Sequence, residues 1–218
     1  MVPADLSDVR RRYVKELLAP DARAAWAVID DAVAHGAAPR RIYLEILTPA
    51  MEEIGRLWET ARIGVAQEHL ATQITQTVLA RLAPSLEQDG EPGHRARIAV
   101  VAGTPHELHA IGARMVADFL EASGWDVLLL GADTPQGEIV ALARDRRPDV
   151  VALSTSLSFN LLAAGRVFAA LRHLDPAPLL VAGGRAYEGR AERALINGAD
   201  VFAADPETLV RELSLRLQ

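Results

Sequence analysis

The sequence predicts an α/β protein in two parts: an N-terminal four-helix bundle cap, then a doubly wound, flavodoxin-like (Rossmann-type) domain with five parallel strands. Two observations carry this prediction. Apolar residues recur at helical spacing up to about residue 84, with no convincing strand. Beyond residue 96, five short apolar runs alternate with helical stretches, which is typical of a parallel sheet covered on both faces. The predicted boundaries are 1–84 for the bundle, 85–96 for a linker and 97–218 for the α/β domain.

The N-terminal part carries four apolar stripes, each of which predicts one helix with a buried face. Short segments separate the stripes, which favours a four-helix bundle. The stretch from Pro84 to Arg97 is rich in proline, glycine and charge, and predicts the linker. The four stripes consist of Leu6, Val9, Tyr13, Leu17 and Leu18; of Trp26, Val28, Ile29 and Val33, ended by Gly36; of Ile42, Ile46, Met51, Ile54 and Leu57; and of Leu70, Ile74, Val78 and Leu82.

The C-terminal part contains five strand-like apolar runs, and a helical stretch follows each of them. A sheet of this kind binds ligands at the carboxyl ends of its strands, near the point where the strand order reverses. Chemistry is therefore expected in the loops that follow the strands. The predicted strands are 98–101, 127–130, 150–153, 179–182 and 201–203, and the predicted helices are 108–123, 136–146, 160–173, 187–197 and 206–217.

Composition excludes several classes of function. The net charge of −6 disfavours direct nucleic-acid binding, which usually needs a basic excess. The absence of cysteine removes disulfides, zinc–thiolate sites and thioether-linked chromophores. The N-terminus has no apolar signal core, and no apolar run approaches 18 residues. We expect a soluble, cytoplasmic protein that does not bind membranes.

The segment Glu107-Leu108-His109-Ala110-Ile111-Gly112 lies just after the first predicted strand. Imidazole is a good ligand for a transition metal, and Glu107 is placed to accept the other ring N–H and fix the tautomer. Gly112 allows a bulky group to approach the start of the helix closely. Taken alone, a histidine in such a loop is more often an ordinary polar residue than a ligand.

The spacing of two later elements strengthens the metal interpretation. Ser154-Thr155-Ser156 follows Gly112 after 41 residues, 113 to 153, and Gly183-Gly184 follows after a further 26, 157 to 182. This pattern resembles the cobalamin-binding domains of methionine synthase, corrinoid mutases and corrinoid methyl carriers, over roughly residues 95–218.

The resemblance implies cobalamin as the cofactor, with His109 as the lower axial ligand of cobalt. It implies that Ser154 and Ser156 hydrogen-bond the nucleotide tail, and that Gly183 and Gly184 leave room for it. Two residues depart from the family pattern: Glu107 stands for the commoner Asp, and Ser156 for Leu. An ordinary strand-to-helix turn is the alternative interpretation of the two glycines.

The helical part resembles the cap of CarH-type cobalamin photoreceptors over roughly residues 5–85. Their pattern has a Trp, a Val seven residues later and a Glu-His pair ten and eleven residues later, which Trp58, Val65, Glu68 and His69 match. The resemblance implies Trp58 over the upper face of the corrin and Glu68 on ribose hydroxyls, which favours adenosylcobalamin. His69 is expected at the corrin rim or above cobalt. The alternative places Trp58 and Val65 in the bundle core and Glu68 on the surface as a solvated acid.

One departure concerns the light adduct. CarH-type photoreceptors carry after the Trp a His that captures cobalt once light expels the adenosyl group, and this chain has Glu59 there. His69, another donor or water would have to take that place.

The first functional hypothesis is a stand-alone light sensor, not an enzyme. In this hypothesis the chain resembles the light-sensing unit of CarH-type photoreceptors without their DNA-binding domain, as in AerR-type antirepressors and photocobilins. Signalling is expected through a homo-oligomer, such as a dimer, or through a protein partner such as a transcription regulator. A bilin such as biliverdin would be noncovalent, with Arg185, Tyr187 or His173 as candidate anchors. A corrinoid methyl carrier of a methyltransferase system is the alternative, and a cobalamin chaperone or store is the third hypothesis.

Overall fold

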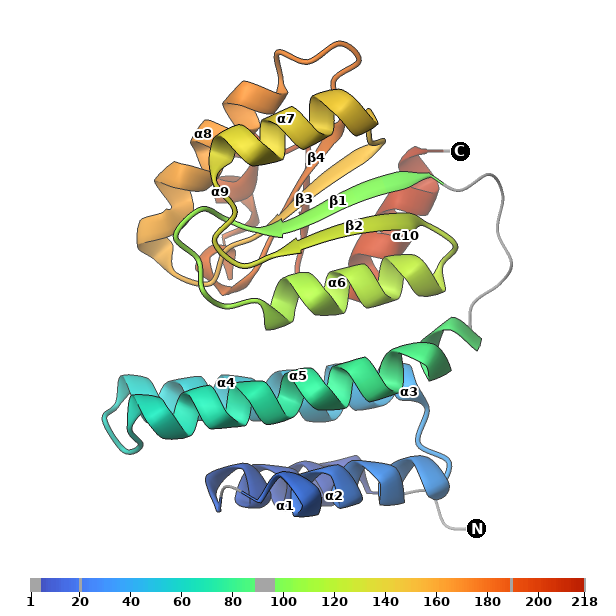
Figure 1. The fold of residues 1–218 in the computed structure, drawn as a ribbon, viewed down its shortest axis with the longest axis vertical. Coiled ribbons are helices and arrows are strands. Elements are labelled where there is room, and N and C mark those ends of the chain that lie inside the picture. Colours follow the sequence, from blue (N-terminus) through green and yellow to red (C-terminus); the bar gives the residue numbers. More distant parts are fainter. Residues whose placement is uncertain (1–4, 20, 89–96, 189, 218) are drawn as a thin grey trace. The chain divides into compact units, whose positions relative to one another are not determined.

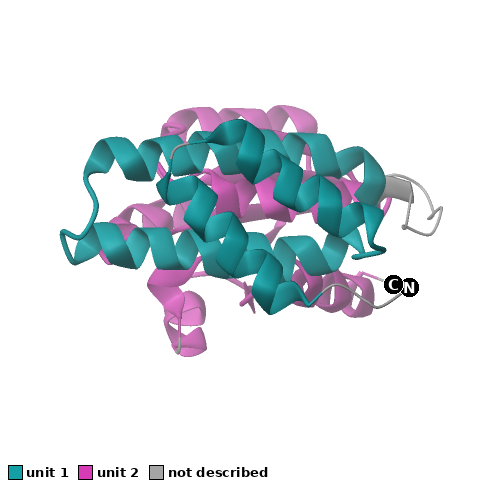
Figure 2. Ribbon diagram, turned by 90° about the horizontal axis from the view of Figure 1, so that it is seen from below, with its two compact units in different colours: residues 1–86 teal, residues 87–218 magenta. Residues whose placement is uncertain are grey.

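The computed structural model describes residues 5–19, 21–88, 97–188 and 190–217. The chain divides into two compact units, Met1–Leu86 and Glu87–Gln218, which are coloured separately in Figure 2. The first is helical and the second is α/β, as predicted. Within the described residues, none of the helices has both the length and the apolar character needed to cross a membrane.

The helical unit contains the four predicted helices (Figure 1). The third is continuous from residue 39 to residue 59 but contains one π-helical stretch in its middle. Asp5 and Asp21 cap the first two, since their side chains accept hydrogen bonds from the Ser7 and Ala24 N–H groups. The helices are α1 (Leu6–Leu18), α2 (Ala22–Ala34), α3 (Pro39–Arg41) with η1 (Ile42–Leu47) and α4 (Thr48–Glu59), and α5 (Val65–Gln88).

The predicted linker and two of the apolar stripes need correction. Helix α5 continues through Pro84 to Gln88, so residues 85–88 are helical, and residues 89–96 lie outside the described part. In α2 the buried face includes Ala25 and Ala32, whereas Val33 is exposed. In α5 Ala71 is buried, whereas the predicted Leu70 is exposed. Both stripes were misplaced because alanines give a weaker hydrophobic signal than the larger residues beside them.

The α/β unit is a five-stranded, all-parallel sheet of order β2-β1-β3-β4-β5. This is the flavodoxin-like order, in which the chain leaves β1 for one edge and returns to its other side. The strands are β1 (Ile98–Gly103), β2 (Asp126–Gly131), β3 (Val150–Ser154), β4 (Leu179–Gly183) and β5 (Val201–Ala203). The helices are α6 (Ile111–Ala122), α7 (Gln136–Arg146), η2 (Ser158–Asn160), α8 (Leu161–Leu171), η3 (Arg185–Tyr187), α9 (Ala191–Ile196) and α10 (Pro206–Arg216).

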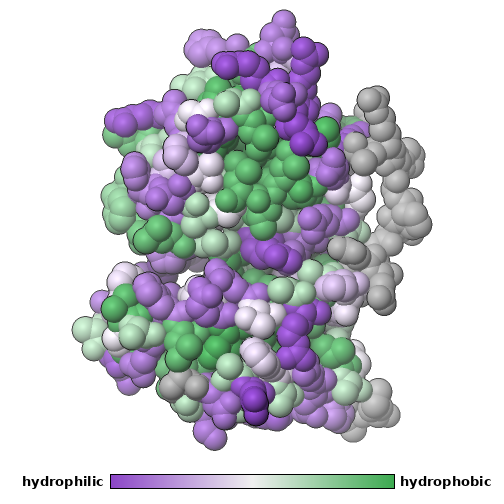
Figure 3. All heavy atoms as spheres, viewed as in Figure 1, coloured by the Kyte–Doolittle hydropathy of each residue, from purple (hydrophilic) through white to green (hydrophobic). Residues whose placement is uncertain are grey.

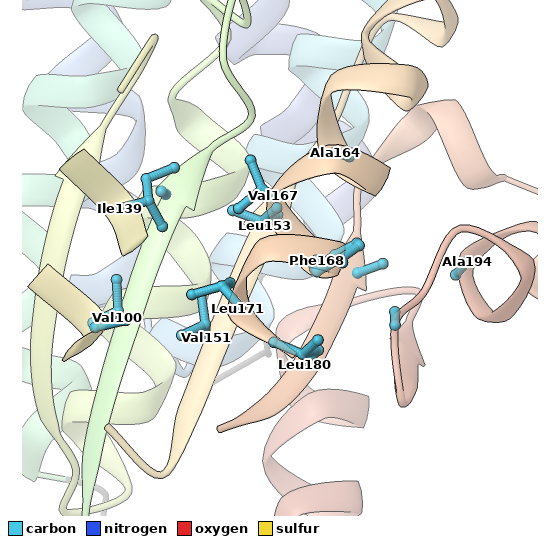
Figure 4. Packing of buried hydrophobic residues seen from close by; sticks show 14 of the residues in the cluster. Val100, Ile139, Val151, Leu153, Ala164, Val167, Phe168, Leu171, Leu180 and Ala194 are labelled. Atoms are coloured by element: carbon cyan, nitrogen blue, oxygen red, sulfur yellow. The ribbon is translucent and has the colours of Figure 1, made fainter. Parts of the chain in front are cut away.

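Helices cover both faces of the sheet (Figure 1). On one face, strand residues such as Val100 and Val151 pack with Ile139 of α7 and Phe168 of α8 (Figure 4). The other face packs against α6 and α10. Double coverage explains why the central strands are continuous apolar runs rather than alternating ones, and it leaves only the ends of the strands for polar chemistry.

Candidate functional site

The three predicted sequence elements meet at the carboxyl edge of the sheet. Gly103 pairs with Ser154, and Ser154 with Gly183, so β1, β3 and β4 end at one level. The loops that follow are joined by backbone bonds, from the Thr104 N–H to the Ser154 carbonyl at 3.1 Å and from the Thr155 N–H to the Gly183 carbonyl at 2.9 Å. This is the switch point at which such sheets bind ligands.

Glu107 is a fully buried carboxylate that links two of these loops. Its Oε1 is hydrogen-bonded to Nδ1 of His109 and accepts from the His109 backbone N–H at 3.2 Å. Its Oε2 accepts from the N–H groups of Ser156 and Leu157 at 2.8 and 3.0 Å. The glutamate thus ties the loop after β1 to the loop after β3.

The charge state of Glu107 fixes the tautomer of His109. Burial alone would raise the pKa of Glu107, but the hydrogen bonds from His109, Leu157, Ser156 and Asn160 outweigh it and lower the pKa to about 2. An ionised carboxylate can only accept hydrogen bonds, so Nδ1 of His109 carries the proton. In the neutral imidazole, Nε2 is then the nitrogen with the lone pair that a metal needs.

The surroundings of His109 suit a large, flat, partly apolar group. The imidazole is 37% exposed although its carboxylate partner is buried. Leu108 and Phe159, next to the two loops that Glu107 joins, are 74% and 73% exposed. Exposed large apolar side chains beside a metal-competent histidine fit a corrin, whose ring presents a broad apolar face.

The protein's own packing limits the space at the glycines of this edge, most severely at Gly184. A Cβ on Gly112 would lie 2.9 Å from the Ser154 hydroxyl, and one on Gly183 would lie 3.3 Å from the Ala203 carbonyl. Gly184 has a φ of +98°, and its Cβ would lie 2.4 Å from the Thr155 carbonyl. Room for a ligand is therefore not the only reason for these glycines, since at Gly184 a tight backbone turn suffices.

Sequence reasoning missed two residues that shape the site. Asn160 is buried, and its side-chain amide donates to Glu107 Oε2 at 3.2 Å and to the His106 carbonyl at 3.3 Å. Asp133 accepts from the His106 N–H at 2.8 Å, while its own N–H donates to the Glu107 carbonyl at 3.0 Å. Both Asp133 and His106 have positive φ. An Asp in a strand-to-helix loop was the available signal for this turn.

The cap residues lie around the turn that joins α4 to α5. Trp58 and Val65 are 37% and 53% exposed, so the alternative that placed them in the bundle core is wrong. Glu68 is largely buried, and its oxygens are hydrogen-bonded to the Thr72 hydroxyl at 2.9 Å and to His69 Nδ1 at 2.6 Å. It is not a freely solvated surface acid.

One candidate bilin anchor is excluded by its position. Tyr187 is fully buried in the core beneath the sheet edge, and its hydroxyl accepts from the Asn197 amide at 2.9 Å. The prediction that Tyr187 could anchor a bilin is wrong, because its ring lies in the hydrophobic core, with 6.3 Å between its centroid and that of the Phe202 ring.

Comparisons with known proteins agree with this geometry. CarH, an HTH-type transcriptional repressor of Myxococcus xanthus, is 36% identical over 60% of this chain and 42% of its own length. Monomethylamine corrinoid protein 1 of Methanosarcina acetivorans is 31% identical over 56% of this chain and 57% of its own length. The chain thus spans about half the length of each of these relatives.

The fold is shared with a solved corrinoid protein. The structure of the Methanosarcina barkeri monomethylamine corrinoid protein superposes with a TM-score of 0.83, covering 96% of this chain and 99% of the other at 20% identity. A family model described as a B12 binding domain matches residues 97–214, and a second model of that description matches residues 9–83. The first match alone covers more than half of the 218 residues, and the chain therefore belongs to the B12-binding domain family, as a cobalamin-binding protein with a helical cap.

Proposed function

We propose that this protein is a cytoplasmic, adenosylcobalamin-dependent light sensor rather than an enzyme. The observation that carries the proposal is the exposed pair Trp58 and Val65 at one end of the helical unit, next to Glu68. Exposed apolar surface rimmed by polar residues marks binding sites when it is contiguous. The similarity to CarH, which matches this chain at 36% identity, supports the same choice.

His109 would bind cobalt through Nε2, with Glu107 holding the ring in the tautomer that binding requires. The cofactor supplies a cobalt–carbon bond that light can break. The residues of this chain orient that centre: Glu107, Ser156 and Asn160 fix the loop that carries His109. Ser154 and the glycines of the same edge would contact the nucleotide tail.

Glu68 would favour the adenosyl form of the cofactor. Each carboxylate oxygen has two acceptor sites, so the bonds to Thr72 and His69 leave capacity for ribose hydroxyls. His69 would lie near the upper face. Because Glu59 stands where CarH-type photoreceptors carry the capturing histidine, the state after photolysis would use His69, another donor or water.

The signal would leave the protein as a change of homo-oligomer or of protein partner, such as a transcription regulator. A second chromophore is a separate part of the proposal. A bilin such as biliverdin would be held without a covalent link, since the chain has no cysteine, and Arg185 and His173 remain its candidate anchors.

A corrinoid methyl carrier is the second candidate function. The fold shared with the Methanosarcina barkeri corrinoid protein and the 31% identity to monomethylamine corrinoid protein 1 favour it. In a carrier, His109 would tune cobalt for methyl transfer between two methyltransferases, and the exposure of Trp58 would have no photochemical role.

Illumination separates the two functions. The protein is loaded with adenosylcobalamin in the dark and then illuminated, while the absorption spectrum and the elution volume are followed. The sensor is expected to form a stable protein-bound photoproduct and to change its assembly. Photolysis no different from that of the free cofactor, with no change in elution, would contradict the sensor and favour the carrier.

Variants assign the residues in the same experiment. Trp58→Ala should alter the yield or stability of the photoproduct, whereas Val33→Ala, at an exposed apolar residue of α2, should not. His109→Ala should lose the histidine-bound cobalt spectrum. Co-expression with a haem oxygenase tests the bilin, which would give a red-absorbing band that persists through purification.

A further inference from the structure

The helical unit carries a second histidine that is backed by a glutamate. Nδ1 of His69 is hydrogen-bonded to Oε2 of Glu68 at 2.6 Å, and Oε1 of Glu68 accepts from the Thr72 hydroxyl at 2.9 Å. The Glu68 side chain is 14% exposed, whereas the imidazole of His69 is 71% exposed. Glu107 and His109 show the same arrangement, in which a buried carboxylate holds Nδ1 of an imidazole that reaches the surface.

The hydrogen bond to Glu68 decides which nitrogen of His69 is able to bind a metal. An ionised carboxylate only accepts hydrogen bonds, so Nδ1 carries the proton and Nε2 of the neutral imidazole has the free lone pair. A carboxylate behind an imidazole also orients the ring and makes the free nitrogen a better ligand. His69 is thus prepared to bind a metal through Nε2.

His69 has too few neighbouring ligands to hold a free metal ion. Over the described ranges of the chain, no three histidine, aspartate or glutamate side chains are grouped so that they could bind one. Imidazole suits transition metals, so the metal for His69 is one whose other positions are already filled. In cobalamin the corrin fills four positions of cobalt and His109 would fill the lower axial one, which leaves a single position for one donor.

Position separates His69 from His35, the only other histidine of residues 1–86. Nδ1 of His35 is also engaged, at 2.8 Å from a backbone carbonyl oxygen, and its side chain is 53% exposed. However, His35 precedes a helix that runs from residue 39 to residue 59, a length of about 30 Å. His69 lies at the other end, where this helix is followed by α5 and where Trp58 and Val65 are exposed.

The end of the helical unit that carries His69 combines apolar and polar side chains. Val65 and His69 are four residues apart on α5, so they share one face of the helix. The turn before α5 is held by a hydrogen bond from the Ala61 N–H to the Trp58 carbonyl at 2.9 Å. Figure 1 shows this turn at the left end of the helical unit, and Figure 3 shows hydrophobic and hydrophilic side chains together there. Such a surface suits a metal that is carried by a large, partly apolar ring.

From this geometry we infer that Nε2 of His69 binds cobalt at the upper axial position once the adenosyl group has left. The inference rests on the proposed function, in which His109 binds the lower position and Trp58 faces the corrin. The step exchanges one ligand: the lone pair of Nε2 forms a bond to cobalt and a water molecule leaves, with no transfer of protons or electrons. His69 thereby supplies the imidazole that is missing at Glu59.

Hydroxocobalamin tests this inference in the dark, without photochemistry. The full chain is loaded with hydroxocobalamin, and absorption spectra are recorded from neutral to alkaline pH. Water on cobalt loses a proton in this range because the metal lowers its pKa, whereas an imidazole on cobalt does not titrate. The wild type is therefore expected to give a spectrum that is independent of pH. His69→Ala should show the change from bound water to bound hydroxide, and added imidazole should abolish that change.

His35→Ala is the matched control, because it removes an exposed imidazole with an engaged Nδ1 from the other end of the unit. It should behave like the wild type, whereas Glu68→Gln should restore part of the pH-dependent change. A wild type that titrates like His69→Ala would overturn the inference. So would a His69→Ala variant with the wild-type spectrum, which would indicate another donor such as Glu59. Since no light is used, these outcomes are separate from failure of the sensor function, which illumination tests.

Discussion

The carboxylate of Glu107 is completely buried, yet the imidazole of His109 to which it is hydrogen-bonded reaches the surface. The pair therefore has one end fixed in the protein and one end presented to a ligand. The buried end is held by donors from Ser156, Leu157 and Asn160. Because these donors belong to the loop after β3, the position of His109 depends on a loop almost fifty residues away in sequence.

Glu107→Gln should weaken cobalamin binding by about 10- to 100-fold, as loss of a partner behind a metal-binding histidine generally does. The amide has one acceptor atom in place of two, so the Ser156 and Leu157 donors would meet an NH₂ group. Titration of the apoprotein with cobalamin, followed by absorption, measures the effect. Glu138→Gln, at an exposed glutamate at the start of α7, is the control, and an equal effect of both changes would rule out a specific role for Glu107.

The stability of the apoprotein should depend on pH through the same carboxylate. The folded pKa of Glu107, about 2, lies below its ordinary value of 4.5. The pKa difference corresponds to a contribution of about 3 kcal/mol to the free energy of unfolding. This contribution is fully present above pH 4.5 and is lost as the pH falls toward 2. The free-energy difference of unfolding between wild type and Glu107→Gln, measured by urea titration from pH 7 to pH 3, should shrink toward the acid end. A difference that stays constant over this range would contradict the lowered pKa.

The doubly covered parallel sheet and the position of His109 could be predicted because both depend on local patterns. Continuous apolar runs fix a doubly covered sheet, and a histidine just after the first run must lie at its carboxyl edge. The role of Asn160 could not be predicted in this way. Its partners, Glu107 and the His106 carbonyl, are more than fifty residues away, and only the packed loops bring them together.

The glycines illustrate a different limit. Their spacing predicted a ligand site, but the structure gives Gly184 a left-handed φ and a carbonyl in the path of any Cβ. A sequence pattern cannot separate a glycine that the backbone requires from one that a ligand requires, because either requirement places a glycine at that position. The cap shows the opposite case. The resemblance to CarH-type caps set a corrin-facing Trp58 against a place for Trp58 and Val65 in the bundle core, and the exposure of both residues excludes the core.

Asn160→Ala should lower the free energy of unfolding by about 1–2 kcal/mol, since the buried Glu107 carboxylate and the His106 carbonyl lose a donor. Asn160→Asp should cost more, because it sets a second carboxylate against Glu107. Chemical denaturation measures both, and cobalamin titration should show weaker binding in the same order. Ser158→Ala, at an exposed residue of η2, should leave stability and binding unchanged. If Asn160→Asp were as stable as the wild type, the contact with Glu107 would have no energetic weight.

Gly184→Ala and Gly137→Ala make a matched pair in the α/β unit. Gly184 combines a φ of +98° with a Cβ position 2.4 Å from the Thr155 carbonyl, whereas a Cβ at Gly137 meets nothing within 4 Å. Gly137 lies in the first turn of α7, where alanine is the better helix former. Gly184→Ala is expected to lose about 2–4 kcal/mol through backbone strain and the clash, and Gly137→Ala to keep or slightly raise stability. Thermal and urea unfolding of the apoproteins test this without any cofactor. An equally mild effect at both positions would mean that the turn after β4 can relax and that backbone packing does not require Gly184.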